Sequence, residues 1–258
     1  VNFTNSYLKY SRDEDLRALL NFYRCYYAFV RGKVTSFRLD QKEMPQAERE
    51  NIRRVASKYF DLACKYASRL EKPALILTAG LIGSGKSYQA RNLAERFGAE
   101  VIRTDVLRKE LLRIAPNEKH HESFGQGIYA GDITRKTYEK AVELAAEKIG
   151  RGIPVILDAS FRCRADRTMA LDMARKLGIP FYVIECTCPD DVVKTRLEKR
   201  MLDPENPSDG RWEILEEQKK QYEAVTEIPQ TCLFQIDTSN SPERVRQQIV
   251  SEIKMAEL

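Results

Sequence analysis

The first seventy residues carry apolar side chains at helical spacing. Two stripes recur every three or four positions, as expected for two amphipathic helices. The first stripe contains Leu16, Leu20, Tyr23, Tyr27 and Val30, and the second contains Ile52, Val55, Tyr59, Leu62, Tyr66 and Leu70. Pro45 precedes the second stripe, at a position where a helix tolerates its missing N–H. We therefore predict an all-α segment over residues 1–71, folded as a helical hairpin with a buried, tyrosine-rich seam.

From residue 73 onward the pattern changes to short apolar runs that alternate with amphipathic helices. The runs cover residues 74–79, 100–103, 154–159, 181–187 and 231–237. Strands that are apolar at nearly every position are typical of parallel sheets, which are buried on both faces. The intervening helices, such as those expected over 87–97 and 132–150, supply the crossovers between the strands. Residues 72–258 are therefore predicted to form an open α/β sheet with helices on both faces.

Composition narrows the class of protein. The hydrophobic fraction of 43% provides enough apolar material for a core, and no apolar run is long enough to span a bilayer. The opening residues lack the basic and apolar regions of an export signal. Six cysteines without a zinc-like spacing suggest reduced, buried thiols, so we expect a cytoplasmic protein that does not enter a membrane. The net charge of +5 suits an anionic substrate but is weak for a duplex-DNA-binding protein.

The strongest chemical signal lies at residues 80–87, which read GLIGSGKS and fit the pattern G-x-x-x-x-G-K-[ST] between a strand and a helix. The backbone N–H groups of such a loop, together with the positive end of the following helix, bind phosphate. Lys86 is placed to bridge the β- and γ-phosphates of a nucleotide, and the Ser87 hydroxyl to bind Mg²⁺. The predicted ligands are therefore ATP and Mg²⁺. The predicted nucleotide-binding residues are Gly80, Gly83, Ser84, Gly85, Lys86 and Ser87.

A second pair of candidates follows the second predicted strand. Asp105 and Arg108 are three residues apart, so they project from one face of a helical turn. A carboxylate near the phosphates can orient and deprotonate an acceptor hydroxyl, and an arginine beside it can hold acceptor or phosphate. The spacing alone leaves open that Asp105 merely caps a helix.

The third predicted strand ends in Asp158, where a carboxylate beside the phosphate loop can organise Mg²⁺. The alternative is a solvated carboxylate at the end of a strand. Arg162, Arg164 and Arg167 follow as a basic cluster that faces the same crevice if a helix starts near residue 163. We expect at least one of them to meet phosphate or substrate, and we take Arg162 and Arg167 as the candidates.

Arg196 and Arg200 stand four residues apart on a predicted helix and lead into residues 203–210, which are rich in Pro, Asn, Asp and Gly. Like charges at this spacing repel each other, so a bound anion would stabilise them. This composition is typical of a lid that closes on ATP and neutralises the migrating phosphoryl group. The alternative is a solvated basic face.

From about residue 75 to residue 237 the chain resembles the P-loop kinase superfamily that includes polynucleotide kinases, zeta toxins, chloramphenicol phosphotransferase and gluconate kinases. It looks most like the ATP-binding domain fused behind aminoglycoside-phosphotransferase-like domains in bacteria. The matching stretches are GLIGSGKS, RTDVLRKEL, GIYAGDITRKTYEKA, VILDASFRCRADR and the region from TRLEKR to SDGRWEILEEQ. Residues 8–34 are similar to the closing helices of that upstream domain, but without its H-x-D-x-x-x-x-N catalytic loop.

The resemblance implies a five-stranded parallel sheet with strand order 2-3-1-4-5. It implies ATP and Mg²⁺ on the phosphate loop, Asp105 as general base with Arg108 beside it, and Arg196 and Arg200 in the lid. It also implies that the helical segment belongs to an upstream phosphotransferase-like domain.

These observations favour a kinase that transfers the γ-phosphate of ATP to a hydroxyl of a small-molecule or nucleoside-type acceptor. A polynucleotide 5′-hydroxyl kinase is the second enzyme hypothesis, with the 5′ end of a nucleic acid as partner. The third is an ATP-gated regulatory or assembly module without acceptor phosphorylation. In each case the helical hairpin is expected to pack on the α/β domain, on an upstream domain or on a second copy of the chain, because its apolar stripes exceed what one hairpin can bury.

Overall fold

The structure is a computed structural model of the chain. It describes residues 6–7, 10–11, 15–70, 72–115, 118, 125–201 and 212–256. The chain divides into two compact units, Val1–Glu71 and Lys72–Leu258, and each is described on its own.

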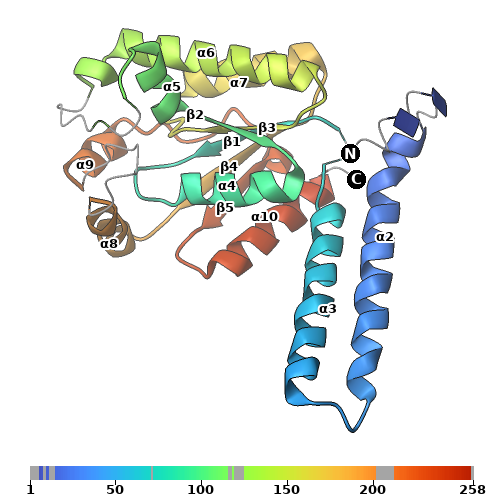
Figure 1. The fold of residues 1–258 in the computed structure, drawn as a ribbon. Coiled ribbons are helices and arrows are strands. Elements are labelled where there is room, and N and C mark those ends of the chain that lie inside the picture. The colour runs from blue at the N-terminus through green and yellow to red at the C-terminus, as the bar shows by residue number, and fades with distance from the viewer. Residues whose placement is uncertain are drawn as a thin grey trace. The chain divides into compact units, whose positions relative to one another are not determined.

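The first unit is a helical hairpin. Helix α2 (Asp15–Phe37) continues into a 3₁₀ turn, η1 (Arg38–Asp40), and α3 (Gln46–Ala67) runs back beside it (Figure 1). The seam is built from small residues, since Ala28, Ala56 and Ala63 are buried there. A Cβ atom added to Gly32 would lie 2.9 Å from the ring of Phe60.

The predicted tyrosine-rich seam is wrong. Tyr23 and Tyr27 are 46% and 65% exposed, because the small residues of α2 and α3 bring the two helices together along another stripe. Tyr59 and Tyr66 are only half-buried, and Arg31 and Arg24 lie 5.8 Å over their rings. The exposed apolar face of α2 consists of Leu19, Phe22, Tyr23, Tyr26, Tyr27, Phe29, Val34 and Phe37.

The second unit is built on a parallel sheet whose strand order is β2-β3-β1-β4-β5, which confirms the expected fold class and order. The strands are β1 (Leu75–Ala79), β2 (Glu100–Arg103), β3 (Val155–Asp158), β4 (Phe181–Thr187) and β5 (Leu233–Asp237). All residues of β1 and β3 are buried, as uninterrupted apolar runs require in a sheet covered on both faces.

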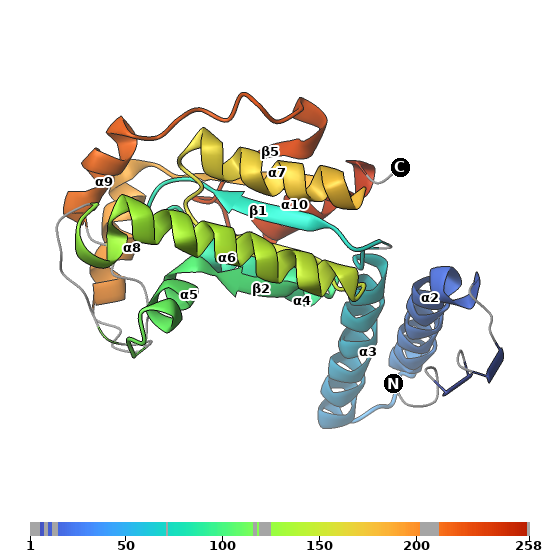
Figure 2. The same ribbon diagram turned by 90° about the horizontal axis from the view of Figure 1, so that it is seen from above.

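Helices cover both faces of this sheet. One face carries α6 (Gly131–Gly150) and α7 (Arg164–Leu177), which lie over the strands in Figure 2. The other carries α4 (Lys86–Phe97) and α10 (Pro242–Ala256), seen below the sheet in Figure 1. The remaining helical elements are α5 (Thr104–Leu111), η2 (Gly127–Tyr129), α8 (Asp190–Met201), α9 (Trp212–Lys220) and η3 (Gln230–Cys232).

Two details differ from the sequence-based expectations. Helix α6 begins at Gly131, so Asp132 lies in its first turn, where its negative charge interacts favourably with the helix dipole. The cysteines are all free, but they are not uniformly buried, because Cys64 is exposed while Cys186 is buried. None of the described helices is both long and apolar enough to cross a bilayer.

Candidate active site

The phosphate loop, residues 80–87, joins β1 to α4. Gly80, Gly83 and Gly85 have φ angles of +125°, +74° and +86°, which glycine adopts without the strain that a side chain would add. Space is short as well, because a Cβ atom on Gly85 would lie 3.2 Å from the Thr238 hydroxyl. The glycines therefore fix the turn of a loop that leads directly into the N-terminus of α4, the end of a helix that favours anions.

Lys86 opens α4 and folds back onto the loop. Its ammonium donates to the carbonyl oxygen of Leu81 at 2.5 Å and to the hydroxyl of Ser84 at 3.3 Å. Ser87 follows in the same helical turn. Two loop residues thus bind the lysine ammonium and hold it next to the residues predicted to meet phosphate.

Three polar side chains meet in register across the carboxyl ends of three strands. Thr78 of β1 and Arg103 of β2 both pair with Asp158 of β3. The Thr78 hydroxyl donates to the buried Asp158 carboxylate at 3.2 Å, and Arg103 Nε lies 3.5 Å from its other oxygen. The Thr104 hydroxyl donates to the backbone carbonyl of Asp158 at 3.3 Å. Asp158 is therefore a fixed, buried carboxylate, which differs from the solvated strand-end alternative.

Asp105 lies one residue inside α5. Arg103 occupies the N-cap position of this helix, and in the described part of the chain no backbone N–H donates to the Asp105 carboxylate, so the helix-cap alternative is not what the structure shows. Burial raises the pKa of Asp105, and the negative charge of Asp158 raises it further. Arg103, Arg108 and Lys86 oppose this rise in pKa. The charges predicted to serve catalysis are therefore close enough to act on one carboxyl group.

Arg108 is buried and held from the side of η2 and α6. It donates to the Ile128 carbonyl at 3.1 Å and to the Thr134 hydroxyl at 3.0 Å, and it stacks 4.9 Å over the ring of Tyr129. Its Nε atom is buried without a hydrogen-bond partner among the described residues. A buried donor left unpaired is costly, so an incoming oxygen at this point would be stabilising.

Arg196 braces the phosphate loop from α8. It donates to the hydroxyl and the carbonyl of Thr238 at 3.0 and 2.6 Å, to the Gly83 carbonyl at 3.4 Å and to Cys188 Sγ at 3.3 Å. The Thr238 hydroxyl in turn donates to the Ser84 carbonyl at 2.7 Å. Arg196 is thus bonded to the loop and is not part of a solvated basic face.

The Arg200 side chain and residues 203–210 lie outside the described part of the structure. Their role in a lid stays a prediction.

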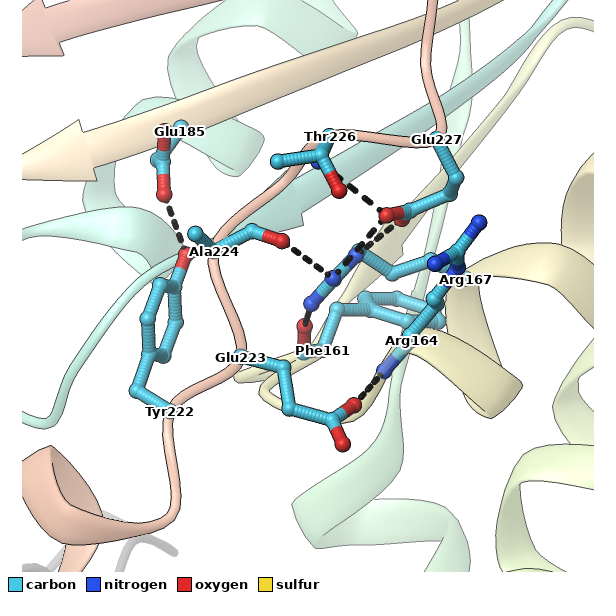
Figure 3. Close-up of polar contacts among 9 residues, drawn as sticks. All are labelled: Phe161, Arg164, Arg167, Glu185, Tyr222, Glu223, Ala224, Thr226 and Glu227. Atoms are coloured by element: carbon cyan, nitrogen blue, oxygen red, sulfur yellow. Dashed lines mark hydrogen bonds and ion pairs between the residues drawn. The ribbon is translucent and has the colours of Figure 1, made fainter.

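The Arg167 side chain is taken up by contacts with the segment before β5 (Figure 3). The side chain is fully buried, and Nε lies 2.5 Å from the Glu227 carboxylate. The guanidinium also donates to the carbonyls of Phe161 at 2.8 Å and Ala224 at 3.2 Å. The segment before β5 passes over the start of α7 and covers this arginine, so the prediction that Arg167 meets substrate is corrected to a structural role.

Arg162 lies just before α7, next to the chain segment that follows α9. It is half-buried, and its backbone carbonyl accepts from the N–H of Glu223 at 3.0 Å. The Glu223 carboxylate accepts from the N–H of Arg164 at the start of α7 (Figure 3). These contacts leave the role of the Arg162 side chain toward substrate as a prediction.

A cavity of ≈ 210 Å³ lies on the β4 side of the loop, between Gly80, Leu81 and the helix α9. At its wall the Tyr222 hydroxyl donates to the buried Glu185 carboxylate at 2.5 Å, as Figure 3 shows. Burial, together with this hydrogen bond, raises the pKa of Tyr222, so the phenol stays protonated and keeps its role as donor. This contact anchors the chain after α9 to β4.

The residues fit a magnesium ion bound together with a nucleotide. Among the described residues no cluster of three or more His, Cys, Asp or Glu side chains could hold a metal alone. Mg²⁺ usually takes one or two protein oxygens and completes its shell with water and phosphate. The fixed Asp158 carboxylate and the Ser87 hydroxyl are oxygen donors of this kind.

Sequence reasoning missed three residues of the site, namely Thr78, Arg103 and Thr238. A usable signal existed, because each is a polar residue at or just after the end of an apolar strand. Carboxyl ends of parallel strands gather on one edge of the sheet, where ligands bind.

Comparison with known proteins agrees with this geometry. The family model described as an AAA domain matches residues 75–225. Uncharacterized proteins of Mycobacterium bovis and Mycobacterium tuberculosis are 29% identical over 200 residues, which cover 77% of this chain and 38% of each relative. Adenylate kinase isoenzyme 5 of Mus musculus is 25% identical over 140 residues, which cover 54% of this chain and 24% of that protein. The chain thus spans well under half the length of these relatives.

Solved structures share the fold. A gluconokinase from Sinorhizobium meliloti superposes with a TM-score of 0.52 at 18% identity, covering 72% of this chain and 94% of that one. An APS kinase from Mycobacterium tuberculosis, in complex with AMPPNP and APS, gives a TM-score of 0.51 at 18% identity, covering 71% and 98%. The α/β unit therefore has the fold of the P-loop kinases.

Proposed function

The chain belongs to the AAA domain family, and we propose that it is an ATP-dependent kinase that transfers the γ-phosphate to a hydroxyl of a small-molecule or nucleoside-type acceptor. The observation that carries this proposal is that the glycine loop with Lys86 directly follows β1, whose Thr78 donates to the buried Asp158 carboxylate at 3.2 Å. A half-buried carboxyl group with a raised pKa, such as that of Asp105, is typical of catalytic sites, and it favours an enzyme over an ATP-binding switch.

In this proposal Asp105 is the general base. It accepts the proton of the acceptor hydroxyl as the oxygen attacks the γ-phosphorus of ATP, and the bond between that phosphorus and ADP breaks. A raised pKa suits this task, because a base works best when its pKa is near the operating pH. Lys86 stabilises the charge that develops on the phosphoryl oxygens.

Two residues would hold Mg²⁺ in this arrangement. The Ser87 hydroxyl and the Asp158 carboxylate would bind the ion, which neutralises phosphate charge when it is bound. Thr78 and Arg103 keep the Asp158 carboxylate in its orientation.

The acceptor side is proposed to contain Arg108 and Arg162. Two hydrogen bonds and the Tyr129 ring fix Arg108, and its Nε, which has no partner among the described residues, can donate to an acceptor oxygen. Arg196 supports the loop, and with Arg200 it is proposed to contribute positive charge to the lid.

The helical unit is proposed to be a packing surface. Eight apolar side chains of α2 are exposed, and contiguous exposed apolar side chains often mark an interaction site. An upstream phosphotransferase-like domain or a second copy of the chain is the partner that we propose for it.

A transfer screen tests the enzymatic proposal. The chain is incubated with γ-labelled ATP and Mg²⁺ and with separate panels of nucleosides, sugars, aminoglycosides and 5′-hydroxyl oligonucleotides. We expect label in one of the small-molecule panels, and none with Lys86→Ala. Label only in the oligonucleotides would favour a polynucleotide kinase. ATP binding without transfer in any panel would contradict the proposal and favour a nucleotide-gated module.

A further inference from the structure

Helix α9 is packed directly on the first half of the phosphate loop. Leu215 of α9 is buried with Val193 and Leu197 of α8. The loop residues Leu81 and Ile82, together with Cys188 and Trp212, pack against this cluster. The loop therefore carries two large apolar residues that have the two helices as partners.

One hydrogen bond between α9 and the phosphate loop accompanies this apolar packing. Gln218 lies three residues after Leu215, on the same face of α9. Its side-chain oxygen accepts the backbone N–H of Ile82 at 2.9 Å. Within the described residues the Gln218 side chain makes no other hydrogen bond, so this contact accounts for its orientation.

The peptide unit that Gln218 holds is the one that holds the catalytic lysine. The carbonyl of Leu81 and the N–H of Ile82 belong to a single peptide group, and that carbonyl accepts from Lys86 Nζ at 2.5 Å. The described chain contains no cis peptide bond, so the carbonyl and the N–H of this group point in opposite directions. Gln218 and Lys86 therefore bind opposite edges of the same peptide group, one at its N–H and the other at its carbonyl.

We propose that Gln218 is a positioning residue for phosphoryl transfer, acting through the Leu81–Ile82 peptide on Lys86. By accepting from Ile82 it fixes the rotation of the peptide, and the Leu81 carbonyl then keeps the lysine ammonium where the β- and γ-phosphates are expected. Gln218 itself does not touch ATP. The inference rests on the proposed kinase function, because it assigns a role within that reaction.

The chemistry favours glutamine at this position. Its amide oxygen is a neutral acceptor, whereas a carboxylate would accept the same N–H but add negative charge near a triphosphate. The helix that carries it is tied to α8, because Lys219 pairs with Asp190 at 2.6 Å and Lys194 lies 5.9 Å over the Trp212 ring. The acceptor is thus presented from a fixed support.

The first arm of the test does not depend on activity. Amide hydrogen exchange at Ile82 is measured by NMR in the wild-type chain, Gln218→Met, Gln218→Glu and the control Gln248→Met. Gln248 is a glutamine of α10 whose exposed amide donates to Glu252 on the same helix. Exchange at Ile82 should rise by about tenfold in Gln218→Met, the scale of one lost hydrogen bond. It should stay slow in Gln218→Glu and in the control.

The second arm follows turnover of γ-labelled ATP, with the acceptor that gives the highest signal. Gln218→Met should lower kcat by about tenfold and change the KM for ATP less, since the lysine loses its support while the rest of the loop remains. Gln218→Glu should recover most of kcat but raise the KM for ATP through charge repulsion.

The two ideas can fail separately. Unchanged Ile82 exchange in Gln218→Met, or faster exchange with an unchanged kcat, overturns the positioning role and leaves the kinase function standing. A wild-type chain that binds ATP and shows no turnover with any acceptor overturns the kinase function, and the positioning role in transfer with it.

Discussion

Arg167 and Glu227 form an ion pair that ties the start of α7 to the segment before β5, with Nε and Oε1 2.5 Å apart and the Arg167 side chain fully buried. Two backbone carbonyls complete the hydrogen bonding of the guanidinium. The pair explains why an arginine of a basic cluster faces inward, because the covering segment brings both a carboxylate and carbonyl acceptors to it.

This arrangement predicts a large loss of stability when one partner is removed. Arg167→Met leaves the Glu227 carboxylate buried without its cation, which typically costs about 3–5 kcal/mol. Urea denaturation measures the change in the free energy of unfolding. The control is Arg175→Met, which removes an exposed pair with Asp172 on the same helix and should cost at most about 1 kcal/mol. Equal losses in the two variants would show that the buried pair contributes no more to the free energy of unfolding than the exposed pair does.

The second prediction concerns nucleotide binding. Lys86→Ala removes a charged donor from the loop, and charge-assisted hydrogen bonds of this kind correspond to roughly 10- to 100-fold in affinity. Calorimetry with ATP and Mg²⁺ should therefore show binding that is much weaker or lost, while circular dichroism shows an intact fold. Affinity equal to that of the wild-type chain would mean that ATP does not bind at this loop.

Whether a feature of the fold or the site could be predicted from the sequence depends on how local that feature is along the chain. The glycines and the lysine of the phosphate loop lie within eight residues, so their spacing predicts the loop without knowledge of the rest of the chain. Asp158 was predictable because an apolar run ends there, next to the loop in a parallel sheet. The strand order followed from the family resemblance, since periodicity alone does not order parallel strands.

What the sequence did not predict depends on contacts between distant segments. Arg167 meets residues about sixty positions away, and the Gln218 contact with Ile82 spans 136 positions. In the hairpin, periodicity marked the apolar stripes of α2 and α3 but not which stripe faces the partner. Gly32 and the buried alanines decide that, because helices approach most closely where side chains are small.

The third prediction separates chemistry from binding. Asp105→Asn should keep the affinity for ATP within a few-fold but lower phosphoryl transfer by roughly 100-fold, the usual scale of a general base. Single-turnover transfer and calorimetry on the same preparation measure the two effects. Asp172→Asn, on the exposed side of α7, is the control and should change neither. Transfer at the wild-type rate in Asp105→Asn would remove Asp105 from the mechanism.

The fourth prediction follows from the raised pKa of Asp105, whose ordinary value is 3.8. Its folded-state pKa lies above its unfolded one, so the folded protein binds this proton more tightly and loses the associated stability as the pH rises through that interval. Asp105→Asn has no charge to bury and should be more stable than the wild type at neutral pH. The difference should shrink as the pH falls and be smallest below 3.8, where the wild-type carboxyl is protonated in both states. Thermal unfolding of the two proteins across this pH range measures it, and a constant difference would assign the effect to something other than titration of Asp105.

The last prediction concerns which of the two units binds the nucleotide and which supports self-association. Every residue proposed to meet phosphate, magnesium or acceptor lies in Lys72–Leu258, and this unit has its own buried core around β1, β3 and β4. A chain truncated to residues 72–258 should therefore fold and bind ATP and Mg²⁺ with an affinity within a few-fold of the full chain. It should also lose any self-association that the exposed apolar face of α2 supports. Calorimetry measures the first effect and sedimentation over a range of concentrations the second. If the truncated chain folds but no longer binds ATP, the hairpin contributes to the nucleotide site. If the full chain stays monomeric at high concentration, a second copy is not the partner of that face, and an upstream domain and the α/β domain are left as partners.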